Sequence, residues 1–185
     1  IPKRPGTDES RPGTSVTGPR LAGPTAGAQV PARAEGRYTG EMPIDGPYEP
    51  SPWGPIADQV ALYESSGGTE GTVLEGKPCV ILWTKGRRTG AVRKTPLMRV
   101  TDGDRYAVVA SMGGAPDHPV WFHNVVADPQ VSLQDGPDLG DYTAHVADAA
   151  EKAEWWPRCT EVWPSYDDYQ ASTDRDIPVI VLEPR

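Results

Sequence analysis

The sequence predicts an α+β fold, mainly β, in which helices pack outside an antiparallel sheet or barrel. Three observations lead to this prediction. Short apolar runs of strand length recur along the chain, the turn Asp102-Gly103-Asp104 joins two of them directly, and regular alternation of strand and helix is absent. A length of 185 residues fits one main domain.

The first 36 residues differ in composition from the rest. They contain six prolines and six glycines, no aromatic residue and no apolar periodicity. Such a segment buries too little surface to offset the entropy of ordering its backbone. We therefore predict that residues 1–36 are a flexible leader, native or derived from an expression vector, and that residues 37–185 form the folded domain.

The expected helices are amphipathic segments with recognisable ends. Over Pro55–Ser66 apolar residues recur at helical spacing, and two glycines end the pattern. Pro119 suits the first position of a short helix over Val120–Ala127. Asp148 is expected to cap a third helix, and Ser165 a fourth that carries two tyrosines.

The expected strands are short apolar runs bounded by turn residues. They are Cys79–Trp83, Leu97–Thr101, Tyr106–Ala110, Val131–Gln134, Tyr142–Val146 and Ile177–Glu183. Strands adjoin strands through short turns, so the sheet is predicted to be antiparallel.

Charge and apolar content exclude several classes of protein. The leader carries five basic and three acidic residues, a net +2 that leaves −10 for the rest of a chain with total charge −8. An acidic body argues against nucleic-acid binding. No run reaches the ~18 apolar residues of a membrane-spanning helix, and the leader lacks the apolar core of a secretory signal. A cytoplasmic protein is expected, with peripheral contact to the inner face of the cell membrane left open.

Cysteines and histidines show no motif spacing. Cys79 and Cys159 are expected to be buried free thiols, as in a reducing compartment. His118, His123 and His145 lack the spacing of metal ligands, so no metal site is predicted.

The most informative segment runs from residue 84 to residue 96. Five cations fall within ten of its residues, with no acid among them. Gly86 and Gly90 permit turns that aim successive backbone N–H groups into one concavity. Arginine adds a planar fork that grips phosphate or carboxylate. This basic loop is predicted to hold a small polyanion; the alternative is a solvated surface hairpin.

The same loop resembles a known family. Thr84–Gly90, followed by Arg93 and Thr95-Pro96-Leu97, is similar to the cofactor loop of the deazaflavin-dependent nitroreductases, the F420-dependent quinone reductases of actinobacteria. Further matching segments occur in the same order over residues 48–185: Ala110–Ala115, Pro119–Asn124, Ala127–Pro129, Pro164–Gln170 and Thr173–Pro178. The resemblance implies a split β-barrel, in agreement with the strand order above.

The resemblance also implies coenzyme F420, a deazaflavin with a phospholactyl-oligoglutamate tail, and a set of site residues. Those implied to face the phosphate and tail are Arg87, Arg88, Thr89, Arg93 and Lys94. Those implied to line the deazaflavin are Thr95, Pro96, Leu97, Met98, Val109, Ala110, Ser111, Met112, Val120, Trp121, Phe122, His123 and Asn124. Tyr166 and Tyr169 are implied to close the substrate side, and Tyr166 also to approach the deazaflavin.

The catalytic candidates are hydroxyl groups that donate to the negative charge developing on an acceptor oxygen. They are Ser111, Tyr166 and Tyr169. Alternatives remain open for each: Ser111 as a strand terminator, the tyrosines as a cover for the barrel mouth, and Trp121 as core. Met112 and Trp163 replace a lysine and a tyrosine of the best-known nitro-drug-activating member, so the substrate is open.

The predicted activity is hydride transfer from reduced F420 to a quinone, a nitroaromatic or an activated enone. One alternative is a protein that binds or carries F420 without turnover. Another is an FMN-dependent oxidase on the same barrel. The sequence leaves open whether the protein is a monomer or a homodimer.

Overall fold

The computed structural model of the protein describes residues 38–39 and 44–185. The expected leader, 1–36, lies outside them. The helices are α1 Gly54–Ser65, α2 Val120–Ala127, α3 Ala149–Val162 and α4 Ser165–Ala171, with a 3₁₀ turn η1 at Met112–Gly114. The strands are β1 Tyr38–Thr39, β2 Val73–Leu74, β3 Lys77–Lys85, β4 Val92–Met98, β5 Val100–Thr101, β6 Tyr106–Val109, β7 Gln130–Asp135, β8 Asp138–Val146 and β9 Val179–Pro184.

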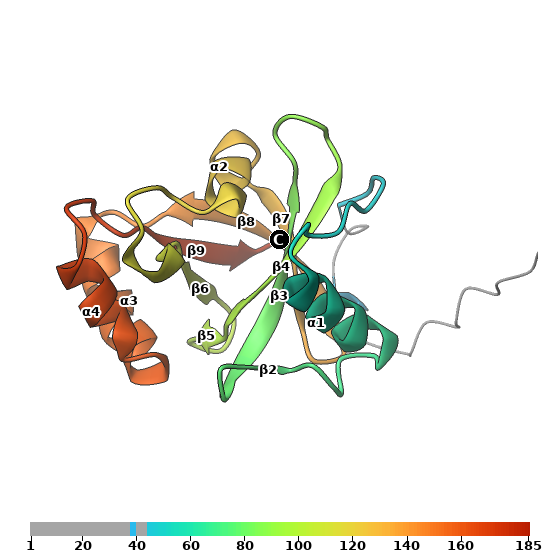
Figure 1. Ribbon diagram of the computed structural model, residues 1–185, viewed down its shortest axis with the longest axis horizontal. Coiled ribbons are helices and arrows are strands. Elements are labelled where there is room, and N and C mark those ends of the chain that lie inside the picture. The colour runs from blue at the N-terminus through green and yellow to red at the C-terminus, as the bar shows by residue number, and fades with distance from the viewer. Residues whose placement is uncertain (1–37, 40–43) are drawn as a thin grey trace, which may run out of the picture. The chain divides into compact units, whose positions relative to one another are not determined.

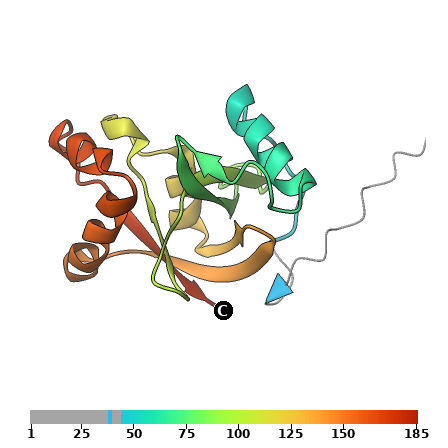
Figure 2. The same cartoon turned by 90° about the horizontal axis from the view of Figure 1, so that it is seen from below.

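The strands of the described residues form one curled sheet. Its order is β2-β3-β7-β8-β9-β6-β5, with β4 paired to β3 and β1 to β8. All pairings except β1–β8 are antiparallel. The sheet curls far enough to bring β4 into contact with β6 (Figures 1 and 2). This arrangement confirms the predicted antiparallel split β-barrel with helices outside.

The main core fills the inside of the curl. Side chains from β3, β6, β7, β8 and β9 meet there, because alternate residues of each strand point inward. Helix α2 closes this core with Trp121 and Val125. The core reading of Trp121 is therefore confirmed, and the short apolar strand runs are explained by burial.

Two further clusters hold the outer helices. Helices α3 and α4 pack through Trp155, Cys159 and Tyr166 on β6 and β9, and this is called the second core below. Helix α1 packs through Val60 and Tyr63 against β3. The two groups of helices lie at opposite ends of the sheet (Figures 1 and 2).

Several predicted boundaries need correction. The strand expected over Leu97–Thr101 is divided at Arg99 between β4 and β5. Pro119 is the N-cap of α2 and not its first residue. Asp148 caps α3 as predicted, accepting from the Ala150 and Glu151 amides. Ser165 does not cap α4: the helix begins at that residue, the N-cap is Pro164, and no side-chain cap bond forms.

The cysteines are free and buried, as predicted. Burial raises the pKa of the Cys79 thiol to about 11, with a smaller contribution from Asp135, and that of Cys159 to about 12. Within residues 38–39 and 44–185, no group of His, Cys, Asp and Glu side chains is arranged to hold a metal ion. No helix in the same ranges is both long and apolar enough to cross a bilayer.

Candidate functional site

The basic loop is the tip of the β3–β4 hairpin. Strand β4 already begins at Val92, so only residues 86–91 form the turn. The Gly86 N–H donates to Ala91 O at 2.7 Å and the Gly90 N–H to Gly86 O at 2.7 Å. Gly90 has a φ of +70°, a conformation that glycine adopts at little cost. Arg87 and Arg88 are exposed on this turn.

Asn124 of α2 fastens the hairpin tip to the barrel. Its buried Oδ1 accepts from the Arg87 amide at 3.2 Å, and its Nδ2 donates to Thr84 Oγ1 at 3.2 Å. The tip accordingly stands beside α2 (Figure 1). Asn124 was expected to line the cofactor ring, but the structure engages its amide in holding the loop.

The five cations of the hairpin fall into two groups. Lys85, Arg87 and Arg88 form no ion pair with any described residue. Arg93 pairs with Glu49, and its Nη1 also donates to Glu49 O at 3.4 Å. The free positive charge is thus concentrated at the turn.

Lys94 points away from the turn, toward α1. Its ammonium pairs with Glu64 and lies 3.9 Å from the ring centroid of Trp83 and 4.5 Å from that of Tyr48. The side chain is only 9% exposed. Trp83 lies opposite Lys94 in the β3–β4 ladder, so both belong to the sheet face that α1 covers. This placement takes Lys94 out of the group expected to face the tail.

Strand alternation also divides the four residues predicted to line the cofactor in β4. Thr95 and Leu97 lie opposite Leu82 and Val80, on the face of the main core. Pro96 and Met98 point to the other face, and Met98 packs in the second core together with Val109. The side chains of the four residues therefore lie on two different faces of β4, with Thr95 and Leu97 sharing the face of the main core.

The Ser111 loop, residues 110–115, follows β6 and is held by an arginine that sequence reasoning missed. Arg175 donates to the carbonyl oxygens of Ala110 at 3.1 Å, Ser111 at 2.5 Å and Ala115 at 2.7 Å. Its Nη1 also lies 3.0 Å from His118 Nδ1. The segment 173–178 was noted only as a matching string. The three oxygens that accept from Arg175 belong to the backbone, so no pattern of side chains in the sequence indicates these contacts.

The same loop packs tightly against α4. Met112 has a φ of +47° and Gly114 one of +80°. A β-carbon on Gly114 would lie 2.3 Å from Ser172 Oγ and 2.9 Å from Tyr169 O. The side chain of Met112 is 55% exposed. The loop and the helix that carries the two tyrosines therefore form one unit.

The two tyrosines differ in exposure. Tyr166 is 6% exposed and packs in the second core beside Trp156, at a ring-centroid distance of 6.3 Å. Its hydroxyl forms no hydrogen bond with a described residue, and burial raises its pKa. Tyr169 is half-buried, with its ring centroid 6.3 Å from that of Tyr166. Tyr169 is thus the more accessible of the two tyrosines expected to form the wall, while the Tyr166 ring packs mainly in the second core.

The first turn of α2 brings a small aromatic group next to Arg175. The rings of His118 and Phe122 lie 4.5 Å apart, and His123 lies 5.7 Å from Phe122. Burial, and then the neighbouring Arg175 charge, lower the pKa of His118. His118 is thus favoured in its neutral form, in which Nδ1 can accept from the guanidinium. Val120 is exposed on the outer side of this turn.

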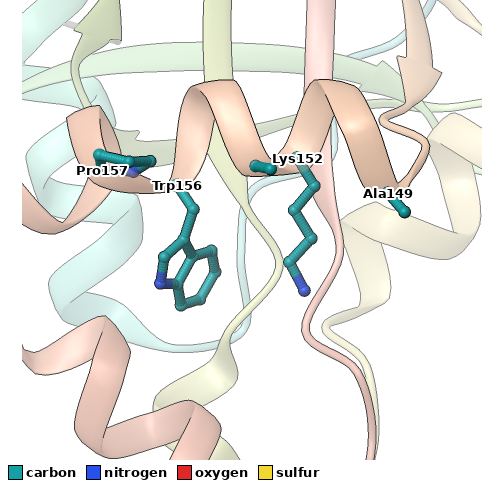
Figure 3. A pocket seen from close by; sticks show the side chains of 5 residues that line it. Ala149, Lys152, Trp156 and Pro157 are labelled. Carbon is teal, nitrogen blue, oxygen red and sulfur yellow. The ribbon is translucent and has the colours of Figure 1, made fainter.

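A hollow on α3 shares no residue with these groups. It is lined by Ala149, Lys152, Ala153, Trp156 and Pro157 (Figure 3). Lys152 pairs with Asp176, and the Trp156 Nε1–H donates to Asp167 at 2.8 Å. Its polar side chains are therefore already engaged within the protein.

Comparison of the sequence with models of known protein families identifies the family of this chain. The profile of the F420H(2)-dependent quinone reductases matches residues 56–184, from α1 into β9. The chain belongs to the F420H(2)-dependent quinone reductase family. The expected family is thereby confirmed, and with it the assignment as a reductase and F420 as the cofactor.

Individual proteins are similar to this chain as well. An F420H(2)-dependent quinone reductase of Mycobacterium tuberculosis is 37% identical over 129 residues, covering 68% of this chain and 87% of the relative. An F420-H2 dependent reductase of known structure (FDR-A) is 46% identical, with a TM-score of 0.55 over 57% of this chain and 94% of that one. Another structure, described as a domain-swapped dimer, is 42% identical with a TM-score of 0.58 over 68% and 95%.

Within this reductase the predicted site residues form two groups. The hairpin tip with Arg87 and Arg88 is joined to α2 through Asn124. The Ser111 loop is joined to α4 at Tyr169 and, through Arg175, to His118 before α2. Helix α2 links the two groups.

Proposed function

We propose that this reductase transfers a hydride from reduced F420 to a quinone, and that nitroaromatics and activated enones are also accepted. The observation that carries the proposal is the cation group at the hairpin tip. Lys85, Arg87 and Arg88 have no acidic partner among the described residues, although the chain as a whole is acidic. Such a group suits a polyanionic ligand.

We assign the phosphate and glutamate tail of F420 to this tip. Arg87 and Arg88 offer planar donor forks, and Lys85 adds a point charge at the end of β3. Arg93 is shared with Glu49 and contributes less. The donor set fits the charge of the tail, while Lys94 serves the packing of α1.

When bound, reduced F420 supplies a hydride from C5 of its central ring, which together with one proton from solvent converts a quinone to a hydroquinone. The protein's part is to align the reactants, since proximity contributes roughly 7–11 kcal/mol in well-oriented reactions. The Ser111 hydroxyl and the Met112 N–H are the proposed donors to the acceptor oxygen. Tyr169 and Phe122 are proposed as apolar walls.

We further propose that the protein acts in the cytoplasm as a homodimer. Two free thiols, Cys79 and Cys159, suit a reducing compartment. The dimer is supported by the structural relative described as a domain-swapped dimer. Light scattering after size exclusion tests it, and a single monomeric species would contradict it.

Stopped-flow absorbance of the protein with reduced F420 and menadione tests the activity. Oxidation of the cofactor coupled to menadione loss is the expected result. Tight F420 binding without turnover would instead indicate a carrier. Titration with FMN is the matched control, and FMN binding equal to or tighter than F420 binding would contradict the assignment of the hairpin tip.

A further inference from the structure

Arg175 lies between α4 and β9 and directs its guanidinium at a single loop. It forms no ion pair with a described residue. Its charge is instead met by the carbonyl oxygens of Ala110, Ser111 and Ala115 and by one ring nitrogen of His118. A half-buried cation bound by three backbone carbonyls fixes the course of that backbone.

The bonded carbonyls are chemically coupled to two amides of the same loop. The Ala110 carbonyl shares a peptide unit with the Ser111 N–H, and the Ser111 carbonyl shares one with the Met112 N–H. A hydrogen bond to the oxygen of a peptide strengthens its N–H as a donor. In a trans peptide that N–H points opposite to the carbonyl, and so away from Arg175. Neither amide donates to a described acceptor.

Arg175 is itself held in place from α4. Gln170 Nε2 donates to Arg175 O at 2.9 Å, and Gln170 Oε1 accepts from the Ile177 amide at 2.8 Å. The backbone from which the guanidinium extends is therefore held against α4, at the residue that follows Tyr169. The cation, the loop and the proposed acceptor wall are mechanically connected.

We infer that Arg175 is a positioning residue for hydride transfer. It orients and polarises the Ser111 and Met112 amides so that they donate to the acceptor oxygen as negative charge develops there. This inference rests on the proposed function, because it takes the Ser111 loop as the acceptor site. Lysine cannot replace Arg175, since a single ammonium does not reproduce a planar fork that reaches three carbonyls.

The first test uses the protein alone. Hydrogen exchange is followed in peptides covering residues 110–116 for wild type, Arg175→Lys, Arg175→Ala and the matched control Arg105→Ala. The Gly114 and Ala115 amides donate to Ser111 O at 3.0 Å and Met112 O at 3.2 Å. They should exchange at least about tenfold faster in both Arg175 variants, as local opening becomes easier. Peptides covering 86–91 should not change. Unaltered exchange at 110–116 would overturn the inference.

The second test separates positioning from folding and from the proposed function. With reduced F420 and menadione, Arg175→Lys should lower kcat by about 10²-fold, the effect expected of misplaced reacting groups. F420 affinity by fluorescence titration should stay within about threefold, because the tail cations are untouched. Guanidinium chloride, below denaturing concentration, should partly restore Arg175→Ala, whereas ammonium chloride should not.

Each outcome of this second test is decisive. Full activity of Arg175→Lys in an active wild-type background overturns the role of Arg175 alone. Equal losses in kcat and in F420 affinity, or rescue by both salts, also overturn it, because they indicate a general effect. An inactive wild type overturns the proposed function, together with any inference about its acceptor.

Discussion

At the scale of single residues, the site depends on side chains whose polar atoms are already engaged. Asn124 Oδ1 accepts from the Arg87 amide and Nδ2 donates to Thr84 Oγ1, so this side chain holds the loop in place. Lys94 is closed between two aromatic rings and Glu64. Arg87 and Arg88 are exposed and form no ion pair with a described residue, so these two side chains remain available to a ligand.

Arg88→Ala should weaken F420 binding by about 1.5 kcal/mol, the lower end for a charge-assisted hydrogen bond, because the side chain is exposed. Tryptophan quenching during F420 titration measures the loss. A cofactor fragment without the tail should bind equally to variant and wild type. Arg105→Ala, which removes a guanidinium paired with Asp102, is the control. Equal weakening of both ligands would place the effect in folding.

Tyr166→Phe should leave turnover nearly unchanged, because the ring packs in the second core and the hydroxyl bonds to no described residue. Ser111→Ala should lower turnover by up to about 10²–10³, the effect of removing one oxyanion donor. Tyr169→Ala should mainly raise the menadione KM, as lost uniform binding does. A Tyr166→Phe enzyme as slow as Ser111→Ala would restore Tyr166 as the donor.

At the scale of elements, the site is assembled by contacts between segments far apart in sequence. Helix α2 meets the β3–β4 hairpin through Asn124, and η1 meets α4 where Gly114 approaches Tyr169. Short-range patterns locate each element, because apolar periodicity and caps such as Asp148 are local. The approach of η1 to α4 depends on a glycine with positive φ, which sequence alone assigns only to a loop.

Gly114→Ala and Gly113→Ala form a matched pair for this contact. Both glycines have positive φ, but a β-carbon on Gly113 meets open space whereas one on Gly114 clashes with Ser172 and Tyr169 O. Urea unfolding should show a loss of about 1–2 kcal/mol for Gly113→Ala from backbone strain. Overpacking should add about 1–3 kcal/mol for Gly114→Ala. Equal losses would show that η1 and α4 move apart freely.

At the scale of the whole molecule, most strands of the barrel could be predicted from the sequence. The face of the sheet on which each candidate site residue lies could not. Continuous apolar runs marked β3 and β9 because they are buried on both faces. The two-residue strands β1 and β2 carry no such signal. Lys94 was grouped with the turn arginines because spacing along a chain does not show that α1 covers its face. The contact of Arg175 with the Ser111 loop was not predicted, because most of its partners there are backbone atoms.

Deleting residues 1–36 should leave the melting temperature and turnover nearly unchanged, because that segment lacks core-forming residues. Deleting residues 1–43 is the informative comparison. It also removes β1, whose Tyr38 pairs in register with Leu139 of β8. A lower melting temperature is expected for the longer deletion only. Scanning calorimetry measures both, and a large loss from the shorter deletion would contradict the predicted leader.

The internal partners of Arg93 and Lys94 have a consequence for how the hairpin responds to ionic strength. Salt screens exposed charges over a Debye length of about 8 Å at physiological concentration and acts much less on enclosed pairs. The Lys94 ammonium, between Trp83, Tyr48 and Glu64, is enclosed. Added salt should therefore weaken polyanion binding mainly through Lys85, Arg87 and Arg88, which form no ion pair with a described residue, while the attachment of α1 to the sheet hardly changes.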